Sequence, residues 1–122
     1  MNNLSLDRKK ELINYRAGGI NMITIMIPYN ADLIKIKKLL NNEYLTALNI
    51  KSKVNRENIT GVLLLTLNEI ENIIESKQIG KGIIILKNST DSFYDETICD
   101  VNVKHFLYLC DNKYHILENE PQ

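Results

Sequence analysis

Two long helical patterns separated by a short polar segment constrain this chain more than any other feature of its sequence. Apolar side chains recur at helical spacing over residues 31–47 and again over residues 55–76. Asn30 and Asp32 supply helix-start chemistry before the first pattern. Because the connection between the patterns is short, the spacing predicts an antiparallel helical hairpin, and its apolar faces require a further layer to cover them.

The rest of the chain predicts that layer. The continuously apolar segment before Pro28 is interrupted only by Thr24, as expected of a buried strand. We predict strands at residues 22–27, 83–86, 97–103 and 106–110, a short amphipathic helix at residues 4–15 and a polar loop at residues 87–94. The predicted fold is therefore α+β: a single domain over residues 1–122, with a roughly four-stranded sheet, packed helices and a protruding helical hairpin.

Charge is distributed unevenly along a chain whose formal net charge is zero. Residues 35–56 contain six lysines and arginines and one glutamate, a net charge of +5. From residue 89 onward two lysines accompany seven acidic residues, a net charge of −5. Such a molecule can present its basic end to RNA. The alternative is that Lys35, Lys37 and Lys38 only solvate an amphipathic helix, and the sequence leaves both interpretations open.

The compartment is predicted from what the sequence lacks. Its two cysteines, Cys99 and Cys110, give no disulfide framework. No apolar run approaches the length that spans a membrane, and the N-terminus has no signal-peptide pattern. We therefore expect a cytoplasmic protein that does not associate with membranes.

The predicted tip of the hairpin carries polar chemistry suited to reading a nucleic acid. Lys51 supplies a mobile positive charge for a phosphate or a base carbonyl, and Asn49 offers both a donor and an acceptor. Glu43 lies near the end of the first predicted helix and could accept from the exocyclic amine of a base. Its alternative role, favoured by spacing alone, is a surface ion pair with a lysine.

A second group of side chains lies near the C-terminal end. Tyr108 and Cys110 share one face of the predicted strand, and Tyr114 follows a turn made by Asp111 and Asn112. A tyrosine can stack on an unpaired base and hydrogen-bond to it. Periodicity alone favours the alternative, in which Tyr108 and Cys110 are inward core residues.

Catalytic interpretations are weaker. Cys99, His105, Cys110 and His115 do not have the spacing of a structural zinc site, so we predict no metal and no cofactor. Cys110 could be a thiol nucleophile only if its pKa were lowered, and no orienting group is evident. Gly18 and Gly19 lack the continuation of a phosphate-binding loop.

Three segments, in the right order, resemble the N-terminal domain of the class-1 peptide chain release factors of eukaryotes and archaea. They are residues 22–28, residues 43–61 with Thr-Ala-Leu-Asn-Ile-Lys-Ser-Lys-Val-Asn-Arg, and residues 108–114 with Tyr-Leu-Cys-Asp-Asn-Lys-Tyr. The family signatures are TASNIKS, followed by a basic residue and Val-Asn-Arg, and the YxCxxxF element. The resemblance implies stop-codon reading in the ribosomal A site by Gly19, Ile20, Asn21, Glu43, Thr46, Asn49, Ile50, Lys51, Ser52, Arg56, Tyr108, Cys110 and Tyr114.

Three departures accompany this resemblance. Leu48 replaces a serine of TASNIKS, and Tyr114 replaces the phenylalanine of the second element. The family's Gly-Thr-Ser loop becomes Gly19-Ile20-Asn21, and Ile20 has no hydroxyl with which to read a purine. We therefore hypothesise that this domain discriminates the third codon position differently and accepts fewer stop codons.

The family resemblance also implies what the 122 residues leave out. They contain neither the Gly-Gly-Gln domain that releases the peptide nor the C-terminal domain that recruits a GTPase partner, so we expect a monomeric binding module rather than an enzyme. The alternative is a standalone RNA- or ribosome-binding paralogue that competes with or regulates termination. The leading interpretation requires Glu43, Lys51, Tyr108 and Cys110 to line one exposed concavity.

Overall fold

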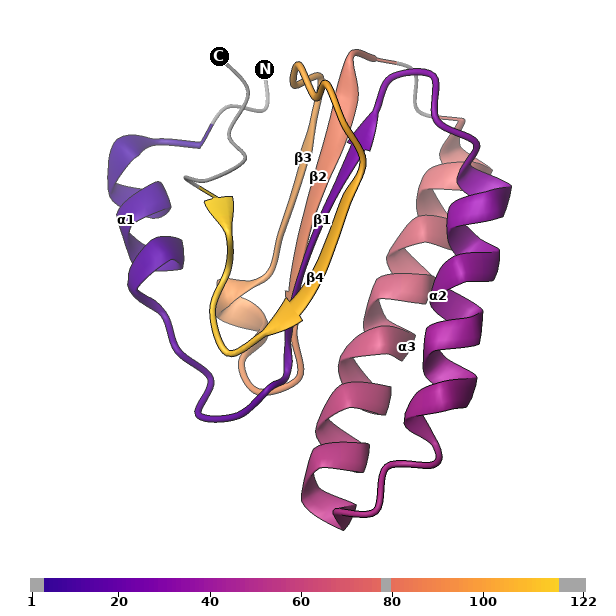
Figure 1. Cartoon of the computed structure of the whole chain (residues 1–122). Coiled ribbons are helices and arrows are strands. Elements are labelled where there is room, and N and C mark those ends of the chain that lie inside the picture. The colour runs from indigo at the N-terminus through magenta and orange to yellow at the C-terminus, as the bar shows by residue number, and fades with distance from the viewer. Residues whose placement is uncertain (1–3, 78–79, 117–122) are drawn as a thin grey trace.

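The computed structural model describes residues 4–77 and 80–116. A four-stranded sheet lies between α1 on one side and the α2–α3 hairpin on the other (Figure 1). The elements are α1 (Leu6–Asn14), β1 (Met22–Pro28), α2 (Leu33–Ala47), α3 (Lys53–Ser76), β2 (Gly82–Asn88), a 3₁₀ helix (Ser92–Tyr94), β3 (Glu96–Cys99) and β4 (Leu107–Asp111). The predicted α+β fold is confirmed. None of the helices in the described ranges combines the length and apolarity needed to cross a membrane.

The central strand explains why the sheet forms where the sequence predicts it. The sheet order is β3-β2-β1-β4, and all its neighbouring strands are antiparallel. In β1, Ile25 lies between Ile85 of β2 and Tyr108 of β4. Both faces of β1 are covered, so nearly all its side chains are buried, which explains its continuous apolar run. Ile23, Ile25 and Ile27 face the hairpin, whereas Met22 and Met26 face α1.

The hairpin forms because both helices have strong start signals and complementary apolar faces. The Asp32 carboxylate accepts from the backbone N–H groups of Ile34 and Lys35 at 3.0 and 3.2 Å. The Ser52 hydroxyl accepts from Asn55 N at 3.3 Å and starts α3 two residues earlier than predicted. α3 packs on β1 and β2, and the tip of the hairpin extends past the ends of the strands (Figure 1).

One predicted strand is shorter in the structure. The alternating residues 97–103 suggest a strand throughout, but β3 ends at Cys99. Asp100 has a left-handed backbone conformation with φ of 60°, which turns the chain out of the extended direction. Val101 N still bonds to Gly82 O at 3.3 Å, so this segment remains beside the sheet edge without joining the strand ladder.

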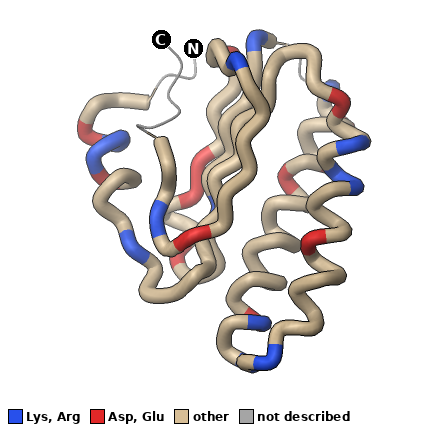
Figure 2. Tube along the Cα trace, in the orientation of Figure 1, with Lys and Arg blue, Asp and Glu red and all other residues tan. Residues whose placement is uncertain are grey.

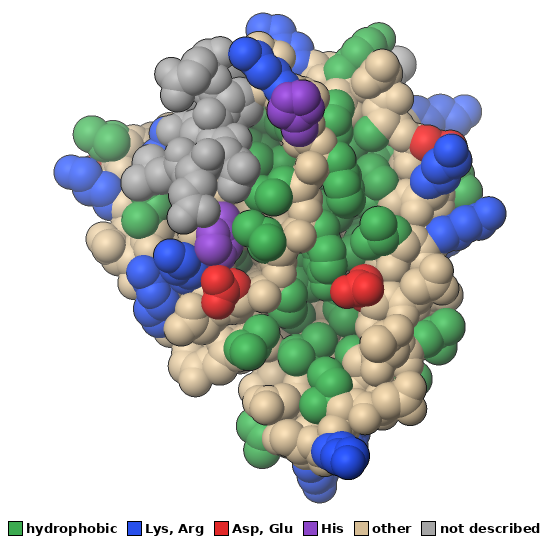
Figure 3. Space-filling model, viewed as in Figure 1, with side chains coloured by type: hydrophobic (Ala, Val, Ile, Leu, Met, Phe, Trp, Pro, Cys, Tyr) green, Lys and Arg blue, Asp and Glu red, His purple; other side chains and the backbone are tan. Residues whose placement is uncertain are grey.

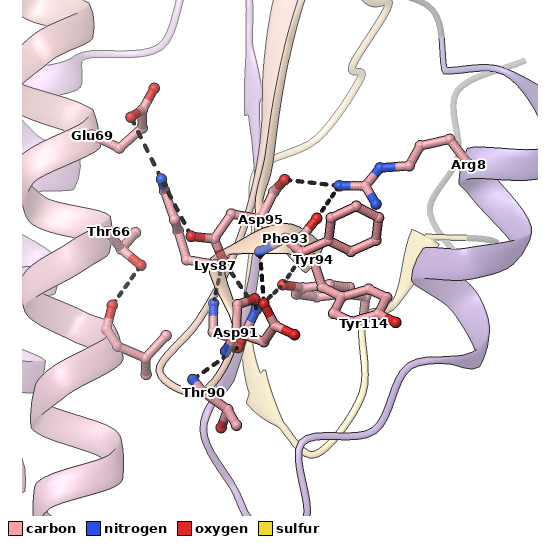
Figure 4. Close-up of polar contacts among 12 residues, drawn as sticks. Arg8, Thr66, Glu69, Lys87, Thr90, Asp91, Phe93, Tyr94, Asp95 and Tyr114 are labelled. Atoms are coloured by element: carbon pink, nitrogen blue, oxygen red, sulfur yellow. Dashed lines mark hydrogen bonds and ion pairs between the residues drawn. The ribbon is translucent and has the colours of Figure 1, made fainter.

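The predicted polar loop at residues 87–94 is more ordered than expected. β2 continues to Asn88, and the side chain of that residue is only 2% exposed. Its amide nitrogen donates to Asp91 O, Asp95 Oδ1 and Tyr114 Oη at 2.9, 3.0 and 3.2 Å. Its amide oxygen accepts from the N–H groups of Thr90 and Asp91 at 2.9 and 2.7 Å. This network, part of which Figure 4 shows, connects β2 with the segment after β4.

Gly61 offers a test of how the hairpin packs on the sheet. A Cβ atom at Gly61 would meet Ser89 Cβ at 3.8 Å, an ordinary contact, so glycine is not required there. We expect Gly61→Ala to raise the free energy of unfolding by about 0.5–1 kcal/mol, because alanine favours the helix interior. Gly82→Ala is the matched contrast, since its Cβ would approach Ile27 O at 2.8 Å. Urea denaturation should show that Gly61→Ala raises the free energy of unfolding and that Gly82→Ala lowers it. A decrease for Gly61→Ala would show that α3 packs more closely on the segment at Ser89 than this contact distance indicates.

Candidate functional site

The turn at the end of the hairpin is held tightly by backbone hydrogen bonds. Leu48 N donates to Tyr44 O at 3.2 Å, and Asn49 N and Ile50 N donate to Thr46 O and Ala47 O at 3.1 Å each. The last turn of α2 is therefore closed, and the chain enters α3 after only a few residues. Side chains that leave this turn are carried on a rigid support, as a recognition element requires.

The tip separates residues that anchor the turn from residues that are presented to solvent. Ile50 packs against the core under the hairpin, and Arg56 Nη1 donates to Ile50 O at 2.9 Å. Ile50, Ser52 and Arg56 thus hold the turn in place from within. Asn49 and Lys51 are exposed, as is Thr46 on the last turn of α2. Figure 2 shows basic residues at this end of the hairpin.

The six basic residues of the segment 35–56 do not form one surface. Lys35, Lys37 and Lys38 lie in the first half of α2, away from the tip, and Lys37 pairs with Glu71 of α3 at 3.2 Å. About 14 Å of helix separate Lys38 from the end of α2. The basic character near the tip therefore comes from Lys51, Lys53 and Arg56 alone.

The second constellation lies on the face of β4 that looks toward the hairpin. Tyr108 and Cys110 stand opposite Ile25 and Ile23 of β1 and pack, partly buried, against the core under the hairpin. β4 is an edge strand of this sheet, so β1 flanks these two side chains on one side and no strand of the sheet flanks them on the other. The predicted shared face of Tyr108 and Cys110 is confirmed, and both retain access to solvent.

Glu43 joins this constellation from α2. Burial raises the pKa of the Tyr108 hydroxyl. The charges of Cys110 and Glu43 raise this pKa further, and so does hydrogen bonding to Glu43. Glu43 makes no ion pair with a lysine in the described part of the chain, so the surface-pair alternative does not hold. An uncharged phenol and an acidic side chain are therefore close enough to influence each other, and together they can offer a donor and an acceptor to a third molecule.

The surface around these groups is largely apolar. In Figure 3, hydrophobic side chains gather between β4 and α2, and an acidic side chain lies at their margin. Tyr44 of α2 contributes a second partly buried ring to the same cluster as Tyr108. A surface of this composition accommodates the flat face of an unpaired base better than it accommodates a phosphate chain.

Tyr114 does not belong to this surface, which corrects the placement that the family resemblance implies. It is 4% exposed and packs in the core on the other face of the sheet, beside α1. Its hydroxyl donates to Tyr94 O at 2.7 Å and accepts from Asn88 Nδ2 at 3.2 Å. The chain crosses to the opposite face after the Asp111–Asn112 turn, so strand alternation no longer applies to residue 114.

The segment Gly19-Ile20-Asn21 contributes one exposed side chain. Asn21 is 3% exposed; its side-chain Nδ2 donates to Thr90 Oγ1 at 3.0 Å and its backbone carbonyl accepts from Ser89 N at 3.2 Å. The Asn21 side chain is therefore buried and holds this segment to the residues after β2, which differs from the exposed position expected of a codon-reading side chain. Ile20 is half exposed, and Gly19 lies beside Asn58 of α3, a residue that no sequence pattern singled out.

The two cysteines lie on different strands and cannot act together in one site. Cys99 is on β3 and Cys110 on β4, the opposite edges of the sheet, and they are not joined by a disulfide. His115 Nε2 lies 2.8 Å from Asp111 Oδ2. Within the described ranges no three His, Cys, Asp or Glu residues are grouped as a metal site would require.

Cys110 should react slowly. Burial, with the charges of Asp111 and Glu43, raises the pKa of its thiol to about 11, which favours the neutral, unreactive form at neutral pH. We expect iodoacetamide to modify Cys110 about 10-fold more slowly than a free thiol at pH 8. Mass spectrometry of the native protein, with the urea-unfolded chain as control, measures this. Modification faster than a free thiol would restore a nucleophilic role.

Comparisons with known proteins agree with this geometry. The profile of the family described as eRF1 domain 1 matches residues 6–120. The eukaryotic peptide chain release factor subunit 1 of Schizosaccharomyces pombe is 31% identical over 115 residues, which cover 87% of this chain and 26% of that protein. The same subunit of Dictyostelium discoideum is 32% identical over 114 residues, 87% of this chain and 25% of that protein. The crystal structure of an archaeal translation termination factor, aRF1, matches 92% of this chain and 32% of its own, with a TM-score of 0.76 and 19% identity.

These matches define first a class of protein: an α+β domain built like the one in the archaeal termination factor. The chain belongs to the eRF1 domain 1 family. It spans about a quarter of the length of the release factors that it matches.

Proposed function

We propose that this domain recognises stop codons of mRNA in the ribosomal A site. The observation that carries the proposal is the meeting of Glu43 with Tyr108 and Cys110 beside a rigid tip that presents Asn49 and Lys51. The chain's relatives are named peptide chain release factors, which supports the same assignment. Translation takes place in the cytoplasm, so we propose that compartment as well.

The two parts of the site divide the work. Lys51 carries a compact positive charge on a flexible stem and would bind a base carbonyl or a phosphate of the first nucleotide. Only about 6 Å of helix separate Glu43 from the end of α2, so its carboxylate lies within the reach of a neighbouring nucleotide. There the carboxylate would accept from an exocyclic amine while the Tyr108 ring contacts the base.

Peptide release itself does not follow from these residues. Cys110, the nucleophile considered from the sequence, has a raised pKa. We propose that residues 1–122 act as one binding domain without hydrolytic activity of its own. A Gly-Gly-Gln domain and a GTPase partner would then require a longer protein or a second factor.

The proposal is tested with a chimera in which this domain replaces the matching N-terminal segment of the Schizosaccharomyces pombe release factor. Peptide release is measured on ribosomes with UAA, UAG, UGA or a sense codon in the A site. We expect release on at least one stop codon and about 100-fold less on the sense codon. Release that ignores the codon would contradict decoding and favour the alternative, a general ribosome-binding paralogue.

The same chimera tests codon range. Ile20 is exposed but offers no hydrogen bond, so we expect the three stop codons to be used unequally. Ile20→Thr restores a hydroxyl and should bring the release rates on the three codons to within about threefold of one another, because one hydrogen bond contributes about 1 kcal/mol. Equal rates that Ile20→Thr leaves unchanged would refute this expectation.

A further inference from the structure

A cavity of about 520 Å³ lies on the face of the sheet that looks toward the hairpin, and the decoding proposal does not use it. It is formed at the end of β1 and the start of β2, which Figure 1 shows at the opposite end of the molecule from the hairpin tip. Ile27 and Ile83, paired across these two strands, and Leu33 of α2 give it an apolar lining. Its volume lies in the range of pockets that hold a ligand.

The charged side chains in the described lining of this cavity are both acidic. Glu69 comes from α3, and Asp100 follows β3. Burial raises the pKa of the Cys99 thiol, which also lines the cavity, and the charges of Asp100 and Glu69 raise that pKa further. Two carboxylates from different elements therefore act on the same part of the cavity.

The basic residue beside this cavity does not balance its negative charge. Lys87 Nζ lies 3.7 Å from Glu69 Oε1 and 3.9 Å from Asp95 Oδ2, so one ammonium group is shared by two carboxylates at distances longer than a hydrogen bond. No described residue forms an ion pair with Asp100. Residues 88–103, which include all of β3, contain four acidic residues and no lysine or arginine. The cavity therefore attracts a cation.

An unpaired strand edge borders the same cavity. β3 is the last strand in the sheet order and, within the described residues, it pairs only with β2. Thr97 and Cys99 of β3 line the cavity, and α3 packs on β1 and β2. Alternate residues of an antiparallel edge strand direct their backbone N–H and C=O groups away from the sheet, where an extended peptide can pair with them.

We propose that the cavity and the outer edge of β3 together bind a basic, extended segment of a protein partner. The segment pairs with β3 and places a lysine or arginine side chain in the cavity. The aliphatic stem of that side chain lies against Ile27 and Ile83, and its charged end meets Glu69. We call this site, formed by the edge of β3 and the cavity beside it, the β3 cleft.

A nucleic acid and a second copy of this chain both fit the β3 cleft less well. The phosphates of a nucleic acid would be repelled by the acidic lining. Pairing of β3 with β3 of a second copy would bring two acidic segments together, which is unfavourable across strands. A basic peptide meets neither obstacle. The proposal goes beyond the proposed function and does not depend on it.

Titration of the native chain with a short peptide, followed by two-dimensional NMR of its backbone amides, tests the proposal. The probe is acetylated and amidated Val-Arg-Val-Arg-Val, whose arginines share one face of a strand, and its control has glutamine in place of both arginines. We expect a dissociation constant below about 1 mM for the arginine peptide and about 10-fold weaker binding of the control. Amide hydrogen exchange in β3 should slow when the peptide is bound, because backbone pairing protects it.

Two variants with the same change of charge locate the binding. Glu69→Gln should weaken the arginine peptide about 10-fold, whereas Glu75→Gln, which is exposed on the same helix and outside the cavity lining, should leave binding unchanged. The amide spectra also show whether both variants fold. Equal effects of the two variants, equal binding of the two peptides or no response at residues 96–100 would overturn the proposal. Putrescine is the free cation without a backbone; if it bound as tightly as the peptide, the part played by the edge of β3 would be refuted.

Discussion

Replacing Lys51 with alanine should lower peptide release by the chimeric factor about 10- to 100-fold at the stop codons that it reads. Lys51 is exposed at the tip and no described residue pairs with it, so its removal costs no internal contact. What is lost is one charged hydrogen bond to the nucleotide, worth about 1–3 kcal/mol. Single-turnover release at saturating factor concentration separates this loss from weaker binding.

Lys53→Ala is the matched control for Lys51→Ala. Lys53 is the first residue of α3 and is exposed like Lys51, but it lies past the Ser52 cap. A variant here changes the net charge by the same amount, so a purely electrostatic attraction to RNA would suffer equally from both substitutions. Equal losses would assign the tip to general RNA attraction and remove Lys51 from codon reading.

Replacing Asn88 with alanine should destabilise the fold by about 3 kcal/mol or more. The side chain is 2% exposed and makes five hydrogen bonds, with Thr90, Asp91, Asp95 and Tyr114. Alanine removes all five hydrogen bonds of a buried amide, each worth about 1 kcal/mol, although Thr90 and Asp91 are exposed and can bond to water instead. Urea denaturation followed by far-ultraviolet circular dichroism measures the change.

Asn72→Ala is the control for Asn88→Ala. Asn72 is exposed on α3, and alanine favours a helix. We therefore expect the free energy of unfolding of this variant to stay within about 0.5 kcal/mol of the native value or to rise. If Asn88→Ala lowered the free energy of unfolding by less than about 1 kcal/mol, water would be replacing the amide and the network would contribute little to stability.

The Asn88 network also bears on the site. Thr90, whose N–H bonds to Asn88, receives the hydrogen bond of Asn21, and Ser89 bonds to the Asn21 backbone. The position of Ile20 thus depends on hydrogen bonds that begin at the opposite face of the sheet. The Tyr114 hydroxyl takes part in this chain, although it lies far from the surface that its motif suggests.

The sequence was sufficient to predict the elements whose signals are local. Asp32 starts α2, and the apolar run before Pro28 is β1, because capping and periodicity act over a few residues. The strand alternation that pairs Tyr108 with Cys110 is equally local. β3 does not extend to residue 103, because Asp100 has a left-handed conformation. The prediction missed this end because that conformation has no distinct sequence signal.

The parts of the site that depend on tertiary register could not be predicted. No periodicity relates Glu43 of α2 to Tyr108 of β4, and only the packing of the hairpin on the sheet brings them together. Motif membership likewise did not separate the residues that contact solvent from those that hold the turn. Ile50 and Arg56 belong to the second group, since both contacts run inward.

The most direct test of the decoding proposal measures binding of the domain itself to ribosomes with a stop codon or a sense codon in the A site. Equilibrium pelleting gives both affinities. The account predicts at least about 10-fold tighter binding to the stop codon, and Glu43→Ala or Tyr108→Ala should abolish that difference while leaving residual binding to the ribosome. Equal affinity for the two complexes, or a preference that survives both substitutions, would contradict it.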